Sequence, residues 1–373
     1  MKIPLLDIPA SYDKILADVE NKIDQVIQSG QFILGPIVEE LEQKISTYCE
    51  TNYAVGVSSG TDALLISLMA AGIGEGDEVI TSPFTFFATA GSIARLGARP
   101  VFVDIEQDTF NINPNLIEKS ITDKTRAIIP VHLYGQSANM DSVLTLAKKN
   151  NLVVIEDAAQ AIGSEYKGRK AGSMGDYGCF SFFPTKNLGG FGDGGMVTMS
   201  SEDIYNRVKT LRVHGSSIKY YHKVIGGNFR IDALQAGIVL AKLKYLDQWT
   251  EMRRGNAQIY NRLFSERGLT NHLTIPPEIV PRHVYNQYVV RVKKKRNELR
   301  SFLSKNNIST EIYYPLPLHL QDCFTFLGYN KGAFPESEKA ANETIALPIF
   351  PELAQNQISH VVEKIDDFFK EIK

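Results

Sequence analysis

Two residues of this chain have the types and positions needed for chemistry between an amine and a carbonyl. Lys186 lies in the run Cys179-Phe-Ser-Phe-Phe-Pro-Thr-Lys186-Asn, and Asp157 ends the run Leu152-Val-Val-Ile-Glu-Asp157. The β-branched residues before Asp157 predict a buried parallel strand with the carboxylate at its carboxyl end. Open α/β sheets bind their ligands at that edge. A lysine can form a Schiff base with an aldehyde, and a carboxylate can keep a pyridine nitrogen protonated. Pyridoxal phosphate (PLP) requires both groups.

Each residue alone also has an ordinary interpretation, as a surface lysine and as a strand carboxylate that caps a loop. The pair gains weight from a phosphate site. In Ser58-Ser-Gly60-Thr61-Asp62 a predicted strand becomes a helix. Gly60 permits close backbone approach, the free N–H groups of the first helical turn attract an anion, and Thr61 adds a hydroxyl. A plain helix N-cap uses the same residues. Ser181 offers another hydroxyl or is an ordinary strand serine.

Composition bounds the class of protein. The chain has 373 residues, 43% hydrophobic and 22% charged, which is typical of a globular protein with room for a large α/β domain and a smaller one. A formal net charge of −2 gives no case for binding nucleic acid or membranes. The basic run from Arg291 to Arg296 is interpreted as a solvated strand end. No segment resembles a signal peptide or membrane span, so a cytoplasmic location is expected. Neither the histidines nor the cysteines have metal-ligand or disulfide spacing; the cysteines are Cys49, Cys179 and Cys323.

Strand-like and helix-like stretches alternate through the first two thirds of the chain, which predicts βαβ units and a mostly parallel sheet flanked by helices. Two helices, interrupted at residues 30–36, precede this region. A single long helix is expected from Asp232 to about Phe264, followed by a small α+β domain with strands at 285–292 and 309–314. We therefore predict a large domain over residues 1–245 and a small C-terminal domain over residues 246–373. The strands expected in the large domain are 53–57, 78–81, 99–104, 126–133, 152–157, 177–183 and 195–199.

Four sequence blocks together resemble the DegT/DnrJ/EryC1/StrS family of PLP-dependent nucleotide-sugar aminotransferases, which have aspartate-aminotransferase fold type I. The blocks are SSGTDAL, TSPFTFFATA, the segment from EDAAQAIG through FFPTKNLGGFGDGG, and GGNFRIDALQA. Their order and spacing match the family, and the resemblance extends from about Leu5 to the C-terminal helix.

The resemblance implies a set of cofactor contacts. Lys186 matches the Schiff-base lysine, and Asp157 matches the partner of the pyridine nitrogen. The other matching positions are Gln160 near the phenolic oxygen, Phe86 stacked on the ring, Gly60, Thr61 and Ser181 at the phosphate, and Asn228, which reaches the phosphate of the neighbouring subunit. Phe86 also suits a core position, and Asn228 suits a Gly-rich turn.

Three further residues are expected at the substrate. Arg230 matches a position that faces substrate or donor carboxylates across a dimer, and it also suits an interface ion pair. Tyr313 and His319 lie in a segment resembling the substrate-contacting strand and loop, for which a proline-bounded structural loop is the alternative. The resemblance thus implies a homodimer with shared active sites.

The activity implied is transfer of an amino group from L-glutamate to a keto group of a nucleotide-linked sugar, in the biosynthesis of an amino sugar for polysaccharide, lipopolysaccharide or another glycoconjugate. The loop at His319 slightly favours carbon C3 over C4. A deoxysugar dehydratase of the same family would carry His at the position of Lys186. A non-catalytic sensor or scaffold would need neither Lys186 nor Asp157. A Rossmann dehydrogenase would need G-x-G-x-x-G after the first strand, where the glycines here have the wrong interval.

Overall fold

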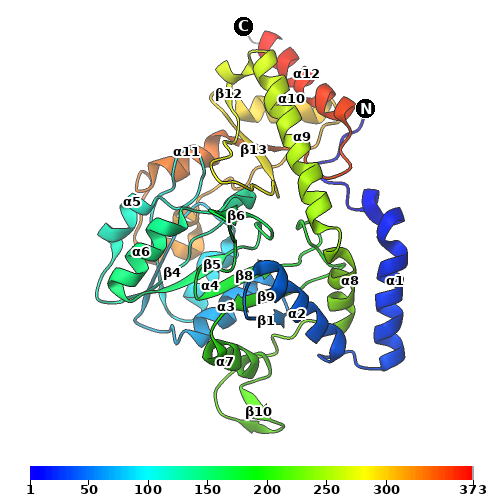
Figure 1. Ribbon diagram of the computed structural model, residues 1–373. Helices are drawn as coiled ribbons and strands as arrows, with labels where there is room; N and C mark the ends of the chain where they lie inside the picture. The colour runs from blue at the N-terminus through cyan, green and yellow to red at the C-terminus, as the bar shows by residue number, and fades with distance from the viewer. Residues whose placement is uncertain (372–373) are drawn as a thin grey trace.

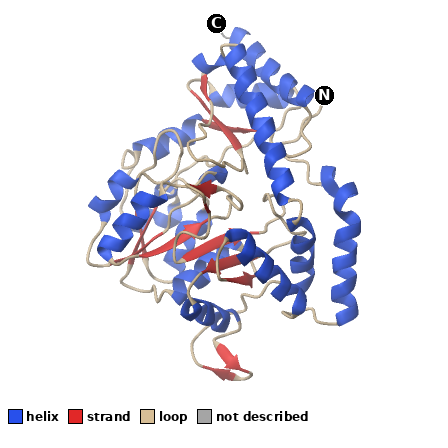
Figure 2. Ribbon diagram, viewed as in Figure 1, coloured by secondary structure: helices blue, strands red, loops and turns tan. Residues whose placement is uncertain are grey.

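The computed structural model describes residues 1–371 and is built around one seven-stranded sheet (Figures 1 and 2). The strand order is β1-β9-β8-β5-β4-β2-β3, and within this sheet only β9 runs antiparallel to its neighbours. The α/β class with a mostly parallel central sheet is confirmed. The strands are β1 Tyr53–Val57, β2 Glu78–Thr81, β3 Arg99–Phe102, β4 Thr125–Ile128, β5 Val153–Asp157, β8 Tyr177–Ser181 and β9 Gly195–Met199.

Helices cover both faces of this sheet. Successive strand residues point to opposite faces, so Met196 of β9 packs into one apolar layer and Val197 into the other. Parallel strands buried in this way need helical crossovers on each side. The layer at Val197 contains α3 (Gly60–Ala70), α4 (Phe87–Arg95) and α7 (Glu202–Arg212), and the layer at Met196 contains α2 (Pro36–Cys49) and α8 (Ala233–Leu243).

Three further helices of the large unit, α1, α5 and α6, pack mainly outside these two apolar layers. The expected pair of N-terminal helices is present, and α1 packs along α8 through Ile15 and Val19 (Figure 1). A third apolar cluster joins α5 and α6 to strands β2, β4 and β5. These helices are α1 Tyr12–Ser29, α5 Pro114–Ile117 and α6 Met140–Asn150.

A second, smaller unit follows the turn at Lys244 and Tyr245. The expected single helix ends at this turn as α8, and a new helix, α9, runs into the smaller unit (Figure 1). There a three-stranded antiparallel sheet packs against three helices around its own apolar core. The elements are α9 Leu246–Glu266, β12 Leu273–Thr274, β13 Tyr288–Val292, α10 Arg296–Lys305, β14 Thr344–Leu347 and α12 Gln355–Glu371.

Several segments cross the predicted division at residue 245. Ile3 is fully buried in the core of the smaller unit and bridges to Ile308. In the opposite direction, Leu318 and Phe324 pack with Ala90 and Phe102 of the large unit. Helix α11 (Pro335–Glu343) follows this segment. Val280, between β12 and β13, also packs into an apolar cluster of the large unit, so the chain passes between the two units at several places besides α9.

One expectation for the smaller unit was wrong, and another holds only in part. Residues 309–314 form no strand, because pairing with β14 stops after the single bridge between Glu311 and Ala346. Pro315 and Pro317 lack the N–H groups that would extend a ladder. The basic run is only partly solvated. Arg291 is buried and pairs with Glu343 at 3.0 Å, and Arg296 is buried and donates to the carbonyl of Thr344.

Candidate active site

The predicted cofactor residues gather at the carboxyl ends of the parallel strands. Asp157 ends β5 and Ser181 ends β8, while Gly60 follows β1 at the start of α3 and Phe86 immediately precedes α4. Because β8 lies between β5 and β9 in the sheet, Asp157 and Ser181 end neighbouring parallel strands. Lys186 lies in the turn that leaves β8. The topology therefore brings together residues that are up to 126 positions apart (60 to 186).

Asp157 is a buried carboxylate with a donor that the sequence did not reveal. Its side chain accepts a hydrogen bond from Thr89 Oγ1 at 2.7 Å and another from the backbone N–H of Ala159 at 3.2 Å. Thr89 in turn lies 3.1 Å from the hydroxyl of Thr85. Burial raises the pKa of Asp157, while Thr89 opposes that rise by stabilising the ionised form. Within the described chain no ion pair compensates this carboxylate, so a cationic ring nitrogen would fit beside it.

The pKa of Lys186 is shifted downward, in contrast to that of Asp157. Burial of its amine among protein atoms lowers its pKa to about 8, although part of the residue remains accessible, and the charge of Asp157 acts in the other direction. At neutral pH a larger fraction of this amine is unprotonated than for a surface lysine. The unprotonated amine is the form that attacks an aldehyde. The local environment thus suits Schiff-base formation.

The predicted phosphate cradle has the required close approach. A Cβ atom added at Gly60 would lie 2.6 Å from Cβ of Ser181, so only glycine fits between α3 and the end of β8. Ser59 caps α3 by accepting from the N–H of Asp62 at 3.0 Å, as the alternative N-cap interpretation predicted. Thr61 is exposed and Ser181 is half-buried. The helix start therefore offers N–H groups and two accessible hydroxyls to an anion.

An aromatic and amide cluster lies at the same edge. Gln160 accepts from the N–H of Tyr134 at 2.7 Å and donates to the hydroxyl of Tyr314 at 3.1 Å. The ring centre of Phe86 lies 6.2 Å from that of Tyr314, and Phe86 remains 57% exposed. An exposed ring at this edge is available for stacking, in contrast to a core phenylalanine. Tyr314 was not predicted, because the adjacent pair of tyrosines in the sequence does not show which of the two contacts Gln160.

Asn228 and Arg230 lie beside the first strand of their own chain. Asn228 is exposed and its backbone bridges to Val213, and the backbone of Arg230 bridges to Val57. Nε of Arg230 is buried and has no hydrogen-bond acceptor among the described residues. The loop thus lies close to the phosphate cradle at the end of β1.

The two other predicted substrate residues have partners within the chain. The carbonyl of Tyr313 accepts from the hydroxyl of Tyr134, and the Tyr313 side chain is half-buried. His319 is 2% exposed, with Nε2 at 3.1 Å from Glu338 and its ring against Phe334. Burial lowers the pKa of His319. The structure places His319 in packing against Phe334 and Glu338, as its alternative structural interpretation implied.

A buried pair next to Asp157 supports the site and was also missed. Glu156 accepts from His132 Nε2 at 2.8 Å and from the N–H groups of Gly172, Met174 and Gly175. Because Nδ1 of His132 accepts from Ala138, its proton resides on Nε2. This network ties the 172–175 loop to the end of β5. The sequence offered only one signal, the acidic pair at positions 156 and 157.

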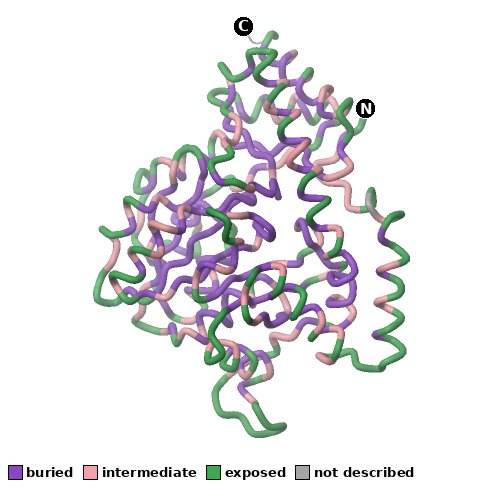
Figure 3. The backbone as a smooth tube through the Cα atoms, in the orientation of Figure 1, coloured by how far each residue is buried: buried purple, intermediate pink, exposed green. Residues whose placement is uncertain are grey.

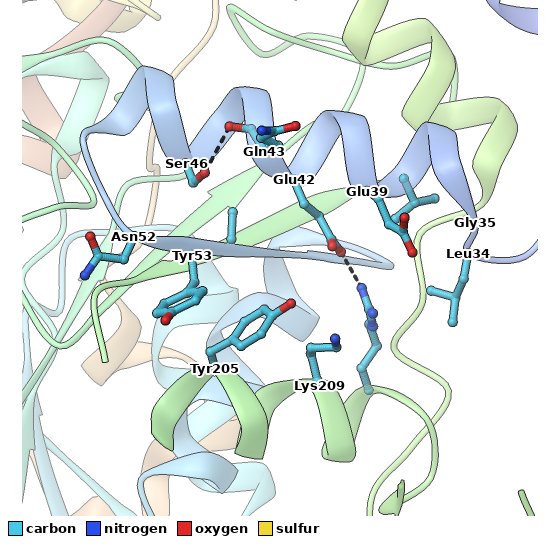
Figure 4. Close-up of a pocket in the computed structure, with 13 residues that line it drawn as sticks. Leu34, Gly35, Glu39, Glu42, Gln43, Ser46, Asn52, Tyr53, Tyr205 and Lys209 are labelled. Carbon is cyan, nitrogen blue, oxygen red and sulfur yellow. Dashed lines mark hydrogen bonds and ion pairs between the residues drawn. The ribbon is translucent and has the colours of Figure 1, made fainter. Parts of the chain in front are cut away.

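The molecule also has a pocket of about 420 Å³ that lies apart from these residues, between α2, β1 and α7 (Figure 4). None of the predicted site residues lines it. Glu42 and Arg212 pair on its inner wall, and they bind the N–H and the carbonyl of Gly56 respectively. β1 is the edge strand of the sheet, and this ion pair satisfies backbone groups that a further strand would otherwise bind.

The fold and site define a PLP enzyme of the aminotransferase type, and comparison with known proteins agrees. Residues 13–366 match the model of the DegT/DnrJ/EryC1/StrS aminotransferase family. The chain is 50% identical over 99% of both lengths to the pleiotropic regulatory protein of Geobacillus stearothermophilus. It is 39% identical to dTDP-3-amino-3,4,6-trideoxy-alpha-D-glucose transaminase of Streptomyces venezuelae, over 100% of this chain and 97% of that protein. The crystal structure of S. venezuelae DesV with a ketimine intermediate superposes with a TM-score of 0.94 at 38% identity, covering 98% of each chain.

The chain therefore belongs to the DegT/DnrJ/EryC1/StrS aminotransferase family. It is an aminotransferase, and PLP is its cofactor. The family resemblance drawn from the four sequence blocks is confirmed.

Proposed function

We propose that this enzyme transfers an amino group from L-glutamate to a keto group, at C3 in preference to C4, of a nucleotide-linked sugar. The observation that carries the proposal is the pair of groups at one sheet edge, a buried Asp157 that forms no ion pair within residues 1–371 and a Lys186 whose pKa is lowered by burial. The similarity to a transaminase named for a dTDP-3-amino sugar supports the sugar substrate and the choice of C3. The product would be an amino sugar for polysaccharide, lipopolysaccharide or another glycoconjugate.

PLP supplies an aldehyde for the amine and a ring that accepts electrons. Lys186 would hold the aldehyde. The Lys186 amine, whose pKa is lowered by burial, would also be the group that moves a proton at the donor's Cα. Asp157 would hold a proton on the ring nitrogen, with Thr89 fixing the orientation of its carboxylate. Gly60, Thr61 and Ser181 would bind the phosphate, Gln160 would face the phenolic oxygen and Phe86 would stack on the ring.

The same proposal includes a homodimer in the cytoplasm with shared sites. Asn228 of one subunit would reach the phosphate of the other, and Arg230 would face a substrate or donor carboxylate. Its buried Nε, which has no acceptor within residues 1–371, leaves it with donor capacity. The hairpin of β10 (Ser216–Ile218) and β11 (Tyr221–His222) leads into this loop and projects from the molecule (Figures 1 and 3). The exposed apolar side chains of the hairpin and of the loop after it, including Ile225 at 92%, suit burial against a second subunit. Within the described chain, no helix is long and apolar enough to span a membrane.

A regulatory function is the second candidate, because the 50% identical relative is named a pleiotropic regulatory protein. A protein that only sensed or scaffolded would need no amine of lowered pKa beside a buried carboxylate. The chemistry of the site therefore favours turnover.

The test is a panel of nucleotide-linked keto sugars incubated with L-glutamate and PLP-loaded protein. The aminated carbon of the product would be located by NMR, and Lys186→Ala would serve as the control. We expect 2-oxoglutarate and one aminated sugar from the native chain and neither from the variant. Equal product formation by Lys186→Ala would contradict the assignment. Amination at C4 alone would contradict the C3 preference.

A further inference from the structure

The turn that carries Lys186 folds back on itself. The N–H of Lys186 donates to the carbonyl of Phe183 at 2.9 Å, and the N–H of Gly190 donates to the carbonyl of Phe182 at 2.7 Å. A Cβ atom at Gly189 would lie 2.6 Å from the carbonyl oxygen of Pro184, so the returning chain allows no side chain there. These bonds close the turn, but they do not fix it against the rest of the molecule.

Two side chains of α8 bind the returning half of this turn. The ammonium of Lys242 donates to the carbonyl of Gly189, and Oε1 of Gln235 accepts from the N–H of Phe191 at 2.9 Å. The two residues are seven positions apart and so lie on one face of the helix. The contact with Gln235 is close, since a Cβ atom at Gly190 would lie 2.7 Å from its Oε1.

Lys242 is a buried lysine that lines the same small cavity as Lys186. It is 5% exposed, and it forms no ion pair with a carboxylate in the described part of the chain. Its Nζ lies 5.4 Å from the ring centre of Phe191 and 6.0 Å from that of Trp249. Burying an ammonium without an anion is costly, and here burial lowers its pKa to about 8. Apart from Trp249, the groups that offset this cost belong to the Lys186 turn.

We propose that Lys242 and Gln235 are positioning residues that fix the Lys186 turn on α8. They thereby hold the Lys186 amine in its position relative to the Asp157 carboxylate. They act through backbone atoms of Gly189 and Phe191 and not on reacting atoms. The expected effect on turnover rests on the proposed role of Lys186. The effect on the turn itself does not, because it is a property of the protein without cofactor.

The first test measures amide hydrogen exchange of residues 182–192 in the full chain without PLP. The variants are Lys242→Met, which keeps the stem, and Gln235→Leu, which keeps the shape. Lys244→Met is the matched control, because Lys244 is exposed two residues away and pairs with Asp18 at 2.7 Å. Loss of a hydrogen bond should speed exchange at Gly190 and Phe191 about tenfold in both variants. Exchange in β5 and in the control should stay unchanged.

The second measurement uses the PLP-loaded enzyme. In Lys242→Met and Gln235→Leu, kcat should fall about tenfold with little change in the donor KM, and Lys242→Arg should recover part of the loss. Unchanged exchange at 182–192 in Gln235→Leu would overturn the inference even if Lys242→Met failed to fold. Equal acceleration throughout β5 would also overturn it, since that indicates general destabilisation. An inactive native enzyme with the expected exchange pattern would instead count against the proposed function alone.

Discussion

At the scale of single residues, burial favours the uncharged form of both Asp157 and Lys186. The pKa of Asp157 is raised and that of Lys186 is lowered to about 8, although each charge partly opposes the shift of the other. Perturbed groups of this kind concentrate at functional sites. A bound cofactor that accepts the lysine amine and carries a cationic nitrogen would relieve both penalties.

Replacing Asp157 by Asn tests the carboxylate. The amide keeps the shape and can still accept from Thr89, but it has no charge to hold a proton on the ring nitrogen. We expect PLP to bind and kcat to fall about a hundredfold, which corresponds to about 3 kcal/mol at the reacting ring. Absorbance of the PLP-loaded variant and steady-state kinetics separate binding from turnover. Near-native kcat would make Asp157 a structural residue.

Thr89→Val tests the donor that the sequence did not reveal. Valine is close in shape to threonine but leaves one oxygen of Asp157 unsatisfied. Because Thr89 lowers the pKa of Asp157, its removal should raise that pKa further. Asp157 would then ionise only at higher pH. The acid limb of the profile of kcat against pH should therefore shift to higher pH. Thr89→Ser retains a hydroxyl and should preserve the native profile. An unmoved limb in Thr89→Val would show that this bond does not tune Asp157.

At the scale of elements, edge strand β1 depends on a buried ion pair in place of a neighbouring strand. Arg212→Met should leave Glu42 charged without its partner and the Gly56 carbonyl unbound. We expect the free energy of unfolding to fall by about 3 kcal/mol, measured by urea denaturation. Lys209→Met is the control on the same helix, since Lys209 is exposed and lines the same pocket. That variant should stay within about 0.5 kcal/mol of the native protein. If both variants lost the same free energy of unfolding, the cause would be a general weakening of α7 and not the loss of the ion pair.

Regular elements were predictable wherever local pattern determines them. β5 follows from a buried β-branched run, and the start of α3 follows from its cap. The failures share a non-local cause. Residues 309–314 have strand-like composition but meet β14 at one bridge only, and Arg291 is buried by Glu343, 52 positions away. The partner of Asp157 was hidden in the same way, because Thr89 reaches it only when β2 and β5 are placed in one sheet.

At the scale of the whole molecule, each site can be completed either by its own chain or by a second subunit. Asn228 and Arg230 lie near the end of their own β1, yet the adjoining hairpin exposes apolar side chains that suit a second subunit. If sites are shared across a two-fold interface, each site combines Lys186 of one chain with Asn228 and Arg230 of the other. If they are not shared, every chain carries a full set of its own.

Complementation separates the two arrangements. Lys186→Ala and an Asn228→Ala/Arg230→Ala double variant should each be inactive alone. After mixing, a heterodimer with shared sites regains one intact site, because one of its two sites receives Lys186 and the native loop while the other receives both defects. We expect activity to return to at most about half that of the native dimer per heterodimer, measured once subunit exchange has been verified with differently tagged chains. Exchange without recovered activity would show that each chain completes its own site, since a defect in either partner would then disable the site that carries it.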